Sequence, residues 1–213
     1  MDYFTQAVVI VGRIGPQGAD LLGTAFMVRK NGVFVTSRHV VGSDPKNIVI
    51  LHPHISKINE YQDVVNTTFE ASHAEIVEVN PIADLVLLKV DGSIPVVPEL
   101  GSLDEVNVSD TVDIFGFPHC VDGRRVLTFQ NAVVGAKVFL ESSTIKVKHA
   151  VINSQTRPGQ SGSMVFCRRI NKVVGLLSGT YAPLGGVLVG GINPAELNQT
   201  SHIVSAEYIQ EML

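Results

Sequence analysis

The chain of 213 residues has no tryptophan, only two cysteines and no excess of positive charge, its formal net charge being −4. None of its apolar runs approaches the roughly 20 residues that a membrane-spanning helix needs. Arginine pairs occur at 124–125 and 168–169, but they are isolated and typical of solvated turns. The sequence therefore predicts neither a membrane span nor a nucleic-acid-binding surface.

The scarcity of cysteine also bears on the cellular compartment. We predict Cys120 in a loop and Cys167 at the end of a strand, both as free thiols, which fits a reducing environment. The first residues offer neither the basic start nor the small-residue cleavage site of a secretory signal. These observations predict a cytoplasmic protein.

Metal-ligand clusters and glycine-rich phosphate loops are missing as well. His52 and His54 are spaced closely enough to chelate a metal, but no cysteine or run of acidic residues accompanies them. The sequence consequently predicts no metal and no cofactor.

What the chain does contain is many short apolar runs bounded by turn residues, in a sequence that is 45% hydrophobic. Residues 7–11, 47–51 and 133–138 are examples rich in valine or isoleucine. This pattern predicts an all-β protein built as a sandwich or barrel. The one expected helix spans residues 202–213, where four apolar side chains share one face.

A serine between glycines, in the segment Arg157-Pro-Gly-Gln-Ser-Gly-Ser163, is the most informative motif. Gly159 can adopt backbone angles that are closed to residues with a Cβ, and Gly162 leaves open space around the Ser161 hydroxyl. Such a turn can present a hydroxyl nucleophile beside free backbone N–H groups. Alone the motif is weak, because short Gly/Ser turns are common.

Two other segments supply the groups that such a nucleophile needs. Residues 23–28 and 32–37 predict two strands joined by a turn at Asn31-Gly32, which leaves His39 just past a strand end. Asp84 precedes the apolar run 85–88 and requires a partner there, because a buried unpaired charge is costly.

The order His39, Asp84, Ser161 is that of the chymotrypsin-like architecture. The chain resembles the trypsin/chymotrypsin-like serine peptidases, and among them the bacterial HtrA (Deg)-like and glutamyl-endopeptidase-like branches. The resemblance runs from about Phe4 to the C-terminus, and four blocks carry it: 36–41, 83–88, 158–163 and 173–179.

The resemblance implies two packed six-stranded antiparallel β-barrels with a short C-terminal helix. The expected N-terminal barrel, residues 1–95, carries the histidine and the aspartate. Residues 96–109 would connect it to the C-terminal barrel, residues 110–213, which carries the serine and the terminal helix. No PDZ domain, such as HtrA-like relatives usually carry, follows the barrels in this chain.

The family's mechanism then implies a role for each residue. Ser161 would attack the scissile carbonyl, His39 would transfer the proton, and Asp84 would orient the imidazole. The N–H groups of Gly159 and Ser161 would form the oxyanion hole. The substrate is expected to be a protein or peptide.

Specificity is implied only by the residues at the family's pocket positions. These positions offer no acid to bind lysine or arginine, and no histidine of the kind found in glutamate-selective relatives. A preference for small or medium uncharged side chains follows. The expected pocket residues are Gln155, Thr156, Leu177, Ser178 and Thr180.

Several alternatives stay open at this stage. Asp113, which also precedes an apolar stretch, is the second candidate for the acid. Gln160 stands where trypsin-type enzymes carry the aspartate that pairs with a processed N-terminus, so activation by propeptide cleavage is not expected. The fold could also serve as a catalytically silent peptide-binding module, or as a latent enzyme ordered by an activating partner protein.

Overall fold

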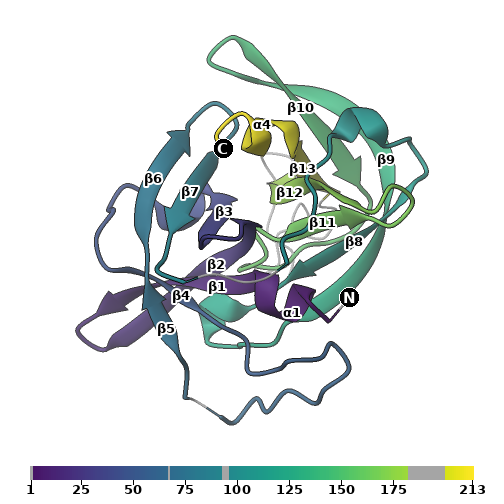
Figure 1. Ribbon diagram of the computed structural model, residues 1–213. Coiled ribbons are helices and arrows are strands. Elements are labelled where there is room, and N and C mark those ends of the chain that lie inside the picture. Colours follow the sequence, from purple (N-terminus) through teal and green to yellow (C-terminus); the bar gives the residue numbers. More distant parts are fainter. Residues whose placement is uncertain (1, 67, 93–95, 182–199) are drawn as a thin grey trace, which may run out of the picture.

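The computed structural model describes residues 2–66, 68–92, 96–181 and 200–213, and it is built almost entirely of strands (Figure 1). The first sheet has the order β5-β4-β1-β2-β3-β7-β6. Its strands are β1 (Val8–Gly15), β2 (Gly18–Arg29), β3 (Val33–Ser37), β4 (Ile48–Leu51), β5 (Ala71–His73), β6 (Glu75–Asn80) and β7 (Leu85–Lys89).

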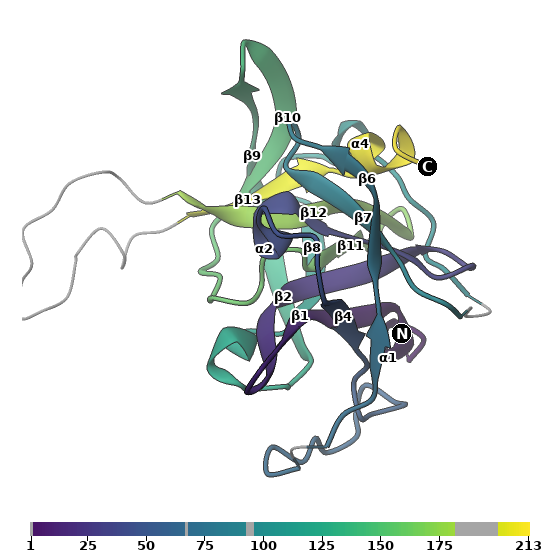
Figure 2. The same cartoon turned by 90° about the vertical axis from the view of Figure 1, so that its left-hand side faces the viewer.

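The second sheet is a closed barrel in the order β10-β13-β12-β11-β8-β9. Its strands are β8 (Thr111–Gly116), β9 (Thr128–Ser142), β10 (Ile145–Ile152), β11 (Met164–Cys167), β12 (Lys172–Tyr181) and β13 (Thr200–Ser205). The β9–β10 hairpin extends beyond the body of the barrel, which is clear in the turned view of Figure 2.

Helices are short in the described part of the chain, and none is long and apolar enough to cross a membrane. They are α1 (Phe4–Ala7), α2 (Arg38–Val41) and α4 (Glu207–Gln210), with 3-10 turns η1 (Leu103–Glu105) and η2 (Cys120–Asp122).

The predicted all-β class and double-barrel architecture are confirmed, but the first sheet has seven strands instead of six. Its two edge strands, β5 and β6, are separated in sequence only by Ala74 (Figure 1). Ala74 is buried, and its N–H donates to the carbonyl of Ile48 at 2.9 Å. The chain bends at this residue and passes from one edge of the sheet to the other, which explains the additional strand.

The predicted hairpin at Asn31-Gly32 is confirmed. β2 ends at Arg29 and β3 begins at Val33, and the N–H of Gly32 donates to the carbonyl of Arg29 at 3.2 Å. Gly32 has a φ of +84°, which a residue with a Cβ rarely adopts. This turn fixes the register of β3 and so the place where β3 delivers His39.

The predicted C-terminal helix begins later than expected. Residues 200–205 form β13, which pairs with both β10 and β12, and only Glu207–Gln210 are helical. Ile203 and Val204 are β-branched and fully buried between two strands, an environment that favours a strand. The helical spacing of the apolar residues was therefore misleading in this segment.

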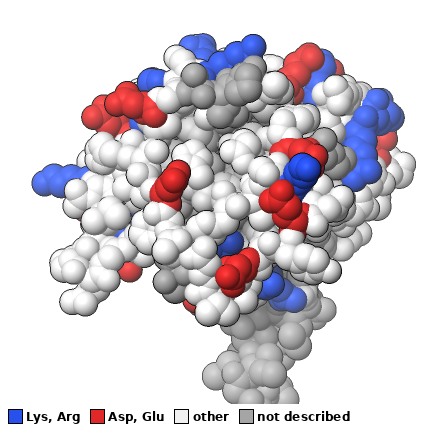
Figure 3. All heavy atoms as spheres, turned by 60° about the horizontal axis from the view of Figure 1, so that its bottom comes forward, with Lys and Arg blue, Asp and Glu red and all other residues white. Residues whose placement is uncertain are grey.

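The predicted connection contains η1 and a parallel bridge from Leu100 to Val173 of β12. Residues 93–95, the last of the predicted N-terminal barrel, lie outside the described part of the chain. Acidic and basic side chains lie interspersed over a mostly uncharged face in Figure 3. The described residues of that face therefore form no extended patch of single-sign charge.

Candidate active site

His39 is held at the point where β3 ends. Ser37 keeps an extended backbone before α2 begins, and Val40 and Val41 are buried, which anchors the short helix. The imidazole stays 46% exposed. A buried strand thus positions a side chain that solvent can reach.

Asp84 contacts His39 twice. Its Oδ2 lies 2.5 Å from His39 Nδ1, and its Oδ1 accepts the backbone N–H of His39 at 3.1 Å. The Asp84 carbonyl also accepts the N–H of Arg38 at 2.8 Å. These contacts fix the position of the carboxylate and the orientation of the imidazole together.

The backbone of Asp84 is unusual, with a φ of +55°. The preceding turn is held by Asn80, whose Oδ1 accepts the N–H groups of Ile82 and Ala83 at 3.1 and 2.9 Å. Left-handed angles in a residue other than glycine tend to occur at functional sites. The Asn80 turn therefore supports the strained residue from which the carboxylate reaches His39.

Ser161 comes from the second barrel and lies against the first. Its carbonyl accepts the N–H of Thr24 at 2.9 Å. A Cβ built on Gly23 would lie 2.9 Å from the side chain of Val40 and 3.1 Å from the Ser161 carbonyl. Gly23 therefore lies between the Ser161 backbone and Val40, the residue that follows His39, at the junction of the two sheets.

Gly162 allows this close approach. Its φ is +89°, and a Cβ there would lie 1.9 Å from the carbonyl oxygen of Thr24. Only a glycine fits such a position. Among the described residues the Ser161 hydroxyl makes no hydrogen bond to His39; hydrogen bonds between a nucleophile and its base are often long in ligand-free structures.

Four consecutive carbonyls of the serine turn, those of residues 158–161, all have partners. Pro158 O accepts from His119 N at 2.6 Å, and Gly159 O from Thr24 Oγ1 at 2.9 Å. Gln160 O accepts from Ser163 N, and Ser161 O from Thr24 N, each at 2.9 Å.

In a trans peptide the N–H points away from the carbonyl of the same unit. The N–H groups of Gly159 and Ser161 are therefore directed away from the anchored carbonyls of Pro158 and Gln160. Within the described residues neither N–H has a hydrogen-bond acceptor. The turn thus holds two free donors beside the serine.

Gln160 stabilises this turn from inside. Its side chain is 2% exposed, and its Oε1 accepts the N–H of Arg157 at 2.6 Å. Its Nε2 reaches Gln130 Oε1 at 3.3 Å. The amide closes the turn internally, without an ion pair to a chain terminus.

Cys120 packs against the same turn. Its Sγ lies 3.7 Å from the carbonyl oxygen of Gly159. Burial raises the pKa of this thiol to about 12, so it remains a protonated, weak donor. Cys120 and Cys167 are both free and buried.

The residues predicted to form a specificity pocket differ in their exposure and in their hydrogen bonds. Gln155 is exposed, whereas Thr156 is buried and its Oγ1 accepts from Ser201 Oγ at 3.0 Å. Ser178 is half-buried, and its Oγ donates to the His202 carbonyl at 3.2 Å.

Leu177 is 1% exposed and packs in the hydrophobic core of the second barrel. It therefore contributes apolar bulk behind any pocket, with little accessible surface of its own. The side chain of Thr180 lies outside the described part of the chain.

Asp113, the second candidate acid, is bonded to other residues than those of this arrangement. It is fully buried on β8, forms an ion pair with Arg168 and accepts from Asn131 Nδ2 at 3.1 Å. None of its contacts among the described residues involves His39.

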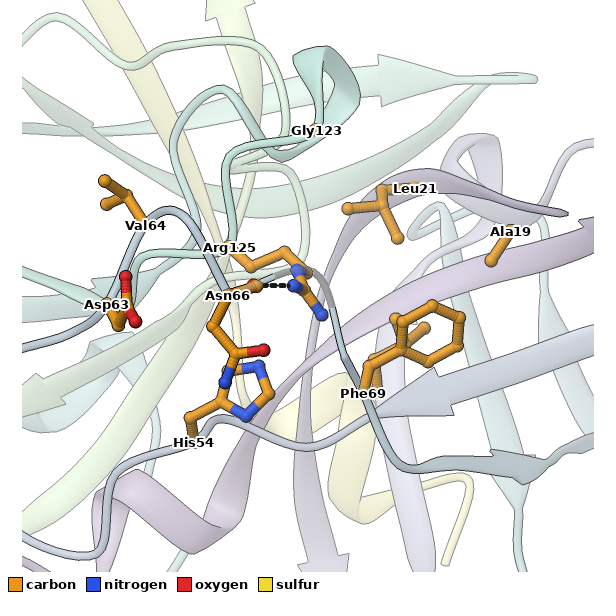
Figure 4. Close-up of a pocket in the computed structure, with 10 residues that line it drawn as sticks. Ala19, Leu21, His54, Asp63, Val64, Asn66, Phe69, Gly123 and Arg125 are labelled. Carbon is orange, nitrogen blue, oxygen red and sulfur yellow. Dashed lines mark hydrogen bonds between the residues drawn. The ribbon is translucent and has the colours of Figure 1, made fainter.

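A pocket of about 220 Å³ lies beside β2, between the segment that follows β4 and the loop after η2 (Figure 4). Arg125 crosses it, donating to the carbonyls of Asn66 and Thr68 and lying over the Phe69 ring. No group of three or more potential metal ligands occurs in the described residues, here or elsewhere.

Comparison with known proteins identifies the family. The sequence-family model of the trypsin-like peptidase domain matches residues 23–176. The chain therefore belongs to the trypsin-like peptidase family, as the resemblance indicated.

Curated relatives support this assignment. A protein named "Probable periplasmic serine endoprotease DegP-like" from Pseudomonas putida strain F1 is 29% identical over 175 residues, covering 80% of this chain and 31% of the relative. The "Magnetosome formation protease MamE" of Paramagnetospirillum magneticum is 30% identical over 171 residues, covering 77% and 21%. This chain thus spans less than a third of the length of these relatives.

Solved structures show the same fold. The apo MamO protease domain from Magnetospirillum magneticum has a TM-score of 0.71 at 17% identity, covering 99% of this chain and 97% of that one. The HtrA-type protease AlgW with a decapeptide has a TM-score of 0.68 at 15% identity, covering 99% and 66%.

Sequence reasoning missed Thr24, which bonds to both Gly159 and Ser161. It also missed Arg38, whose Nε lies 3.7 Å from Asp84 Oδ1. A threonine inside an apolar strand gave no signal that its partners lie in the other barrel.

Proposed function

We propose that the protein is a serine endopeptidase with Ser161 as its nucleophile. One observation carries the proposal: His39 Nδ1 bonds to Asp84 while two free N–H groups, of Gly159 and Ser161, lie in the serine turn across the junction. These are the parts that hydrolysis through an acyl-enzyme requires.

In the proposed reaction Ser161 Oγ attacks the scissile carbonyl and its proton passes to His39 Nε2. Asp84 stabilises the imidazolium through Nδ1, and the N–H groups of Gly159 and Ser161 stabilise the oxyanion. His39 then protonates the leaving amine as the C–N bond breaks. Water attacks the acyl-enzyme with His39 again as base, which releases the acid and restores Ser161.

We further propose that the enzyme prefers small or medium uncharged side chains before the scissile bond. Thr156 and Ser178 offer neutral hydroxyl groups, and Leu177 supplies apolar bulk behind them. None of these three residues carries a charge that would select a charged side chain.

The anchored serine turn favours an enzyme that is competent without a partner over a silent or partner-activated one. A latent enzyme needs a turn that is disordered alone and becomes ordered when a partner binds. Here every carbonyl from Pro158 to Ser161 already has a donor. A cytoplasmic location stays a prediction, which fractionation of the native host would test.

A fluorophosphonate probe tests the proposal without knowledge of the substrate. We expect the wild-type protein to be labelled, and Ser161→Ala and His39→Ala to lose labelling by at least about 1,000-fold. Equal labelling of Ser161→Ala would contradict the assignment. Circular dichroism of both variants serves as the folding control.

A further inference from the structure

We propose that Thr24 is a positioning residue through which the first sheet holds the oxyanion turn of the second barrel in its working conformation. The inference rests on the proposed function, because it concerns the same two N–H groups. It assigns the role to one hydroxyl, Thr24 Oγ1, which never contacts the substrate.

The hydroxyl bridges two segments of the second barrel. Thr24 Oγ1 donates to the Gly159 carbonyl at 2.9 Å and accepts the N–H of Phe117 at 3.1 Å. The Thr24 backbone N–H meanwhile donates to the Ser161 carbonyl at 2.9 Å. One residue of β2 therefore contacts the turn on both sides of Gln160.

Thr24 is itself rigidly held. It is 0% exposed, it is paired with Ile10 in the sheet, and its carbonyl accepts the hydroxyl of Thr36 at 2.6 Å. Thr36 lies on β3, three residues before His39. The same strands that deliver the histidine therefore also fix the turn that carries the serine.

The turn needs such an anchor because Gly159 is conformationally free. Its φ is +90°, and glycine populates several backbone regions at similar cost. The Gly159 carbonyl belongs to the peptide unit that lies between the Gly159 N–H and the Ser161 N–H along the chain. If this carbonyl lost its partner, that unit could rotate and change the direction of the two N–H groups relative to each other. The alternative donor, Cys120 Sγ at 3.7 Å, is weak.

The test removes the hydroxyl and keeps the shape. We expect Thr24→Val to lower the maximal rate of fluorophosphonate labelling about 10- to 100-fold while the probe's reversible affinity changes less than about threefold. Thr24→Ser, which keeps Oγ1, should restore the rate to within about threefold of wild type. A purely structural role would not lower the maximal rate while leaving the reversible affinity nearly unchanged, and Thr24→Ser would not restore that rate.

Thr5→Val is the matched control, because Thr5 is an equally buried threonine whose hydroxyl bonds to Asp2 and Ser56, away from the serine turn. It should label at the wild-type rate. If Thr24→Val does not fold, Thr24→Ala removes the same hydroxyl from a smaller side chain and is judged by the same criteria.

Hydrogen exchange adds a readout that needs no activity. In a Ser161→Ala background, Thr24→Val should raise exchange in residues 157–163 more than Thr5→Val does. Wild-type labelling that depends on Ser161, together with wild-type kinetics in Thr24→Val, would overturn this inference alone. Loss of Ser161-dependent labelling in the wild type would instead overturn the proposed function.

Discussion

Two acidic side chains show how local contacts separate the proposed roles. Asp84 accepts from the His39 backbone and lies 2.5 Å from its imidazole. Asp113 is fully buried, but its partners are Arg168 and Asn131. A buried carboxylate bonded in this way is one member of an ion pair with a structural role.

We therefore expect Asp113→Asn to destabilise the fold by about 2 kcal/mol, because it weakens a buried charge pair and leaves Arg168 without its anion. Urea denaturation measures this loss. Labelling by fluorophosphonate should stay within about twofold of wild type at temperatures where the variant is folded. A folded Asp113→Asn protein that cannot be labelled would move the role of the acid to Asp113.

The sequence motifs place His39, Asp84 and Ser161 because each occurs in a local pattern of turn and strand residues. Thr24 could not be found in this way. Its bond to Gly159 joins residues 135 positions apart in the chain, and such a contact exists only after both sheets have packed.

At the scale of elements, the segment between β4 and β5 is the longest excursion from the first sheet that the structure describes. It is attached to the second barrel by side chains. Gln62 bonds to both the carbonyl and the N–H of Leu127, at 2.7 and 2.8 Å. Arg125 donates to Thr68 O at 2.7 Å and lies 5.6 Å from the Phe69 ring centre.

Arg125→Ala should release this segment. We expect faster amide hydrogen exchange within residues 60–70, and faster cleavage there by an added protease, because two backbone carbonyls lose their donor. Arg124→Ala is the matched neighbour, because Arg124 makes no side-chain hydrogen bond among the described residues. Identical exchange in the two variants would show that Arg125 does not hold the segment.

Elements with strong turn chemistry were predictable, and those defined by their neighbours were not. Asn31-Gly32 indicated its hairpin directly. The apolar residues of 202–213 have helical spacing, yet residues 202–205 lie between β10 and β12, where pairing on both sides favours a strand. The bend at Ala74 depends on a bond to Ile48 in another strand.

At the scale of the whole molecule, the N-terminal helix links the two sheets. Phe4 is 0% exposed, and its ring centre lies 4.7 Å from that of Phe115 on β8 and 5.1 Å from that of Phe166 on β11. The same hydrophobic cluster includes Val8 and Phe26 of the first sheet. The two sheets therefore share a core.

Phe4→Ala should cost about 3–4 kcal/mol of stability, because it opens a cavity where the sheets meet. Since the core is shared, we expect wild type and variant each to unfold in one transition, seen at the same denaturant concentration by fluorescence and circular dichroism. Tyr61→Ala, which removes a fully exposed aromatic ring, should change stability by less than about 0.5 kcal/mol. Two separate transitions in the wild-type protein would show that the sheets are independent.

We propose that this molecule brings its two sheets together to activate one serine. Mass spectrometry that locates the fluorophosphonate adduct tests it most directly, because Ser163 lies two residues away with a buried hydroxyl that has no partner in the described structure. We predict the adduct on Ser161 Oγ alone. An adduct on Ser163 or on a residue outside the turn, or no adduct on the folded protein, would contradict the assignment of Ser161 as the nucleophile.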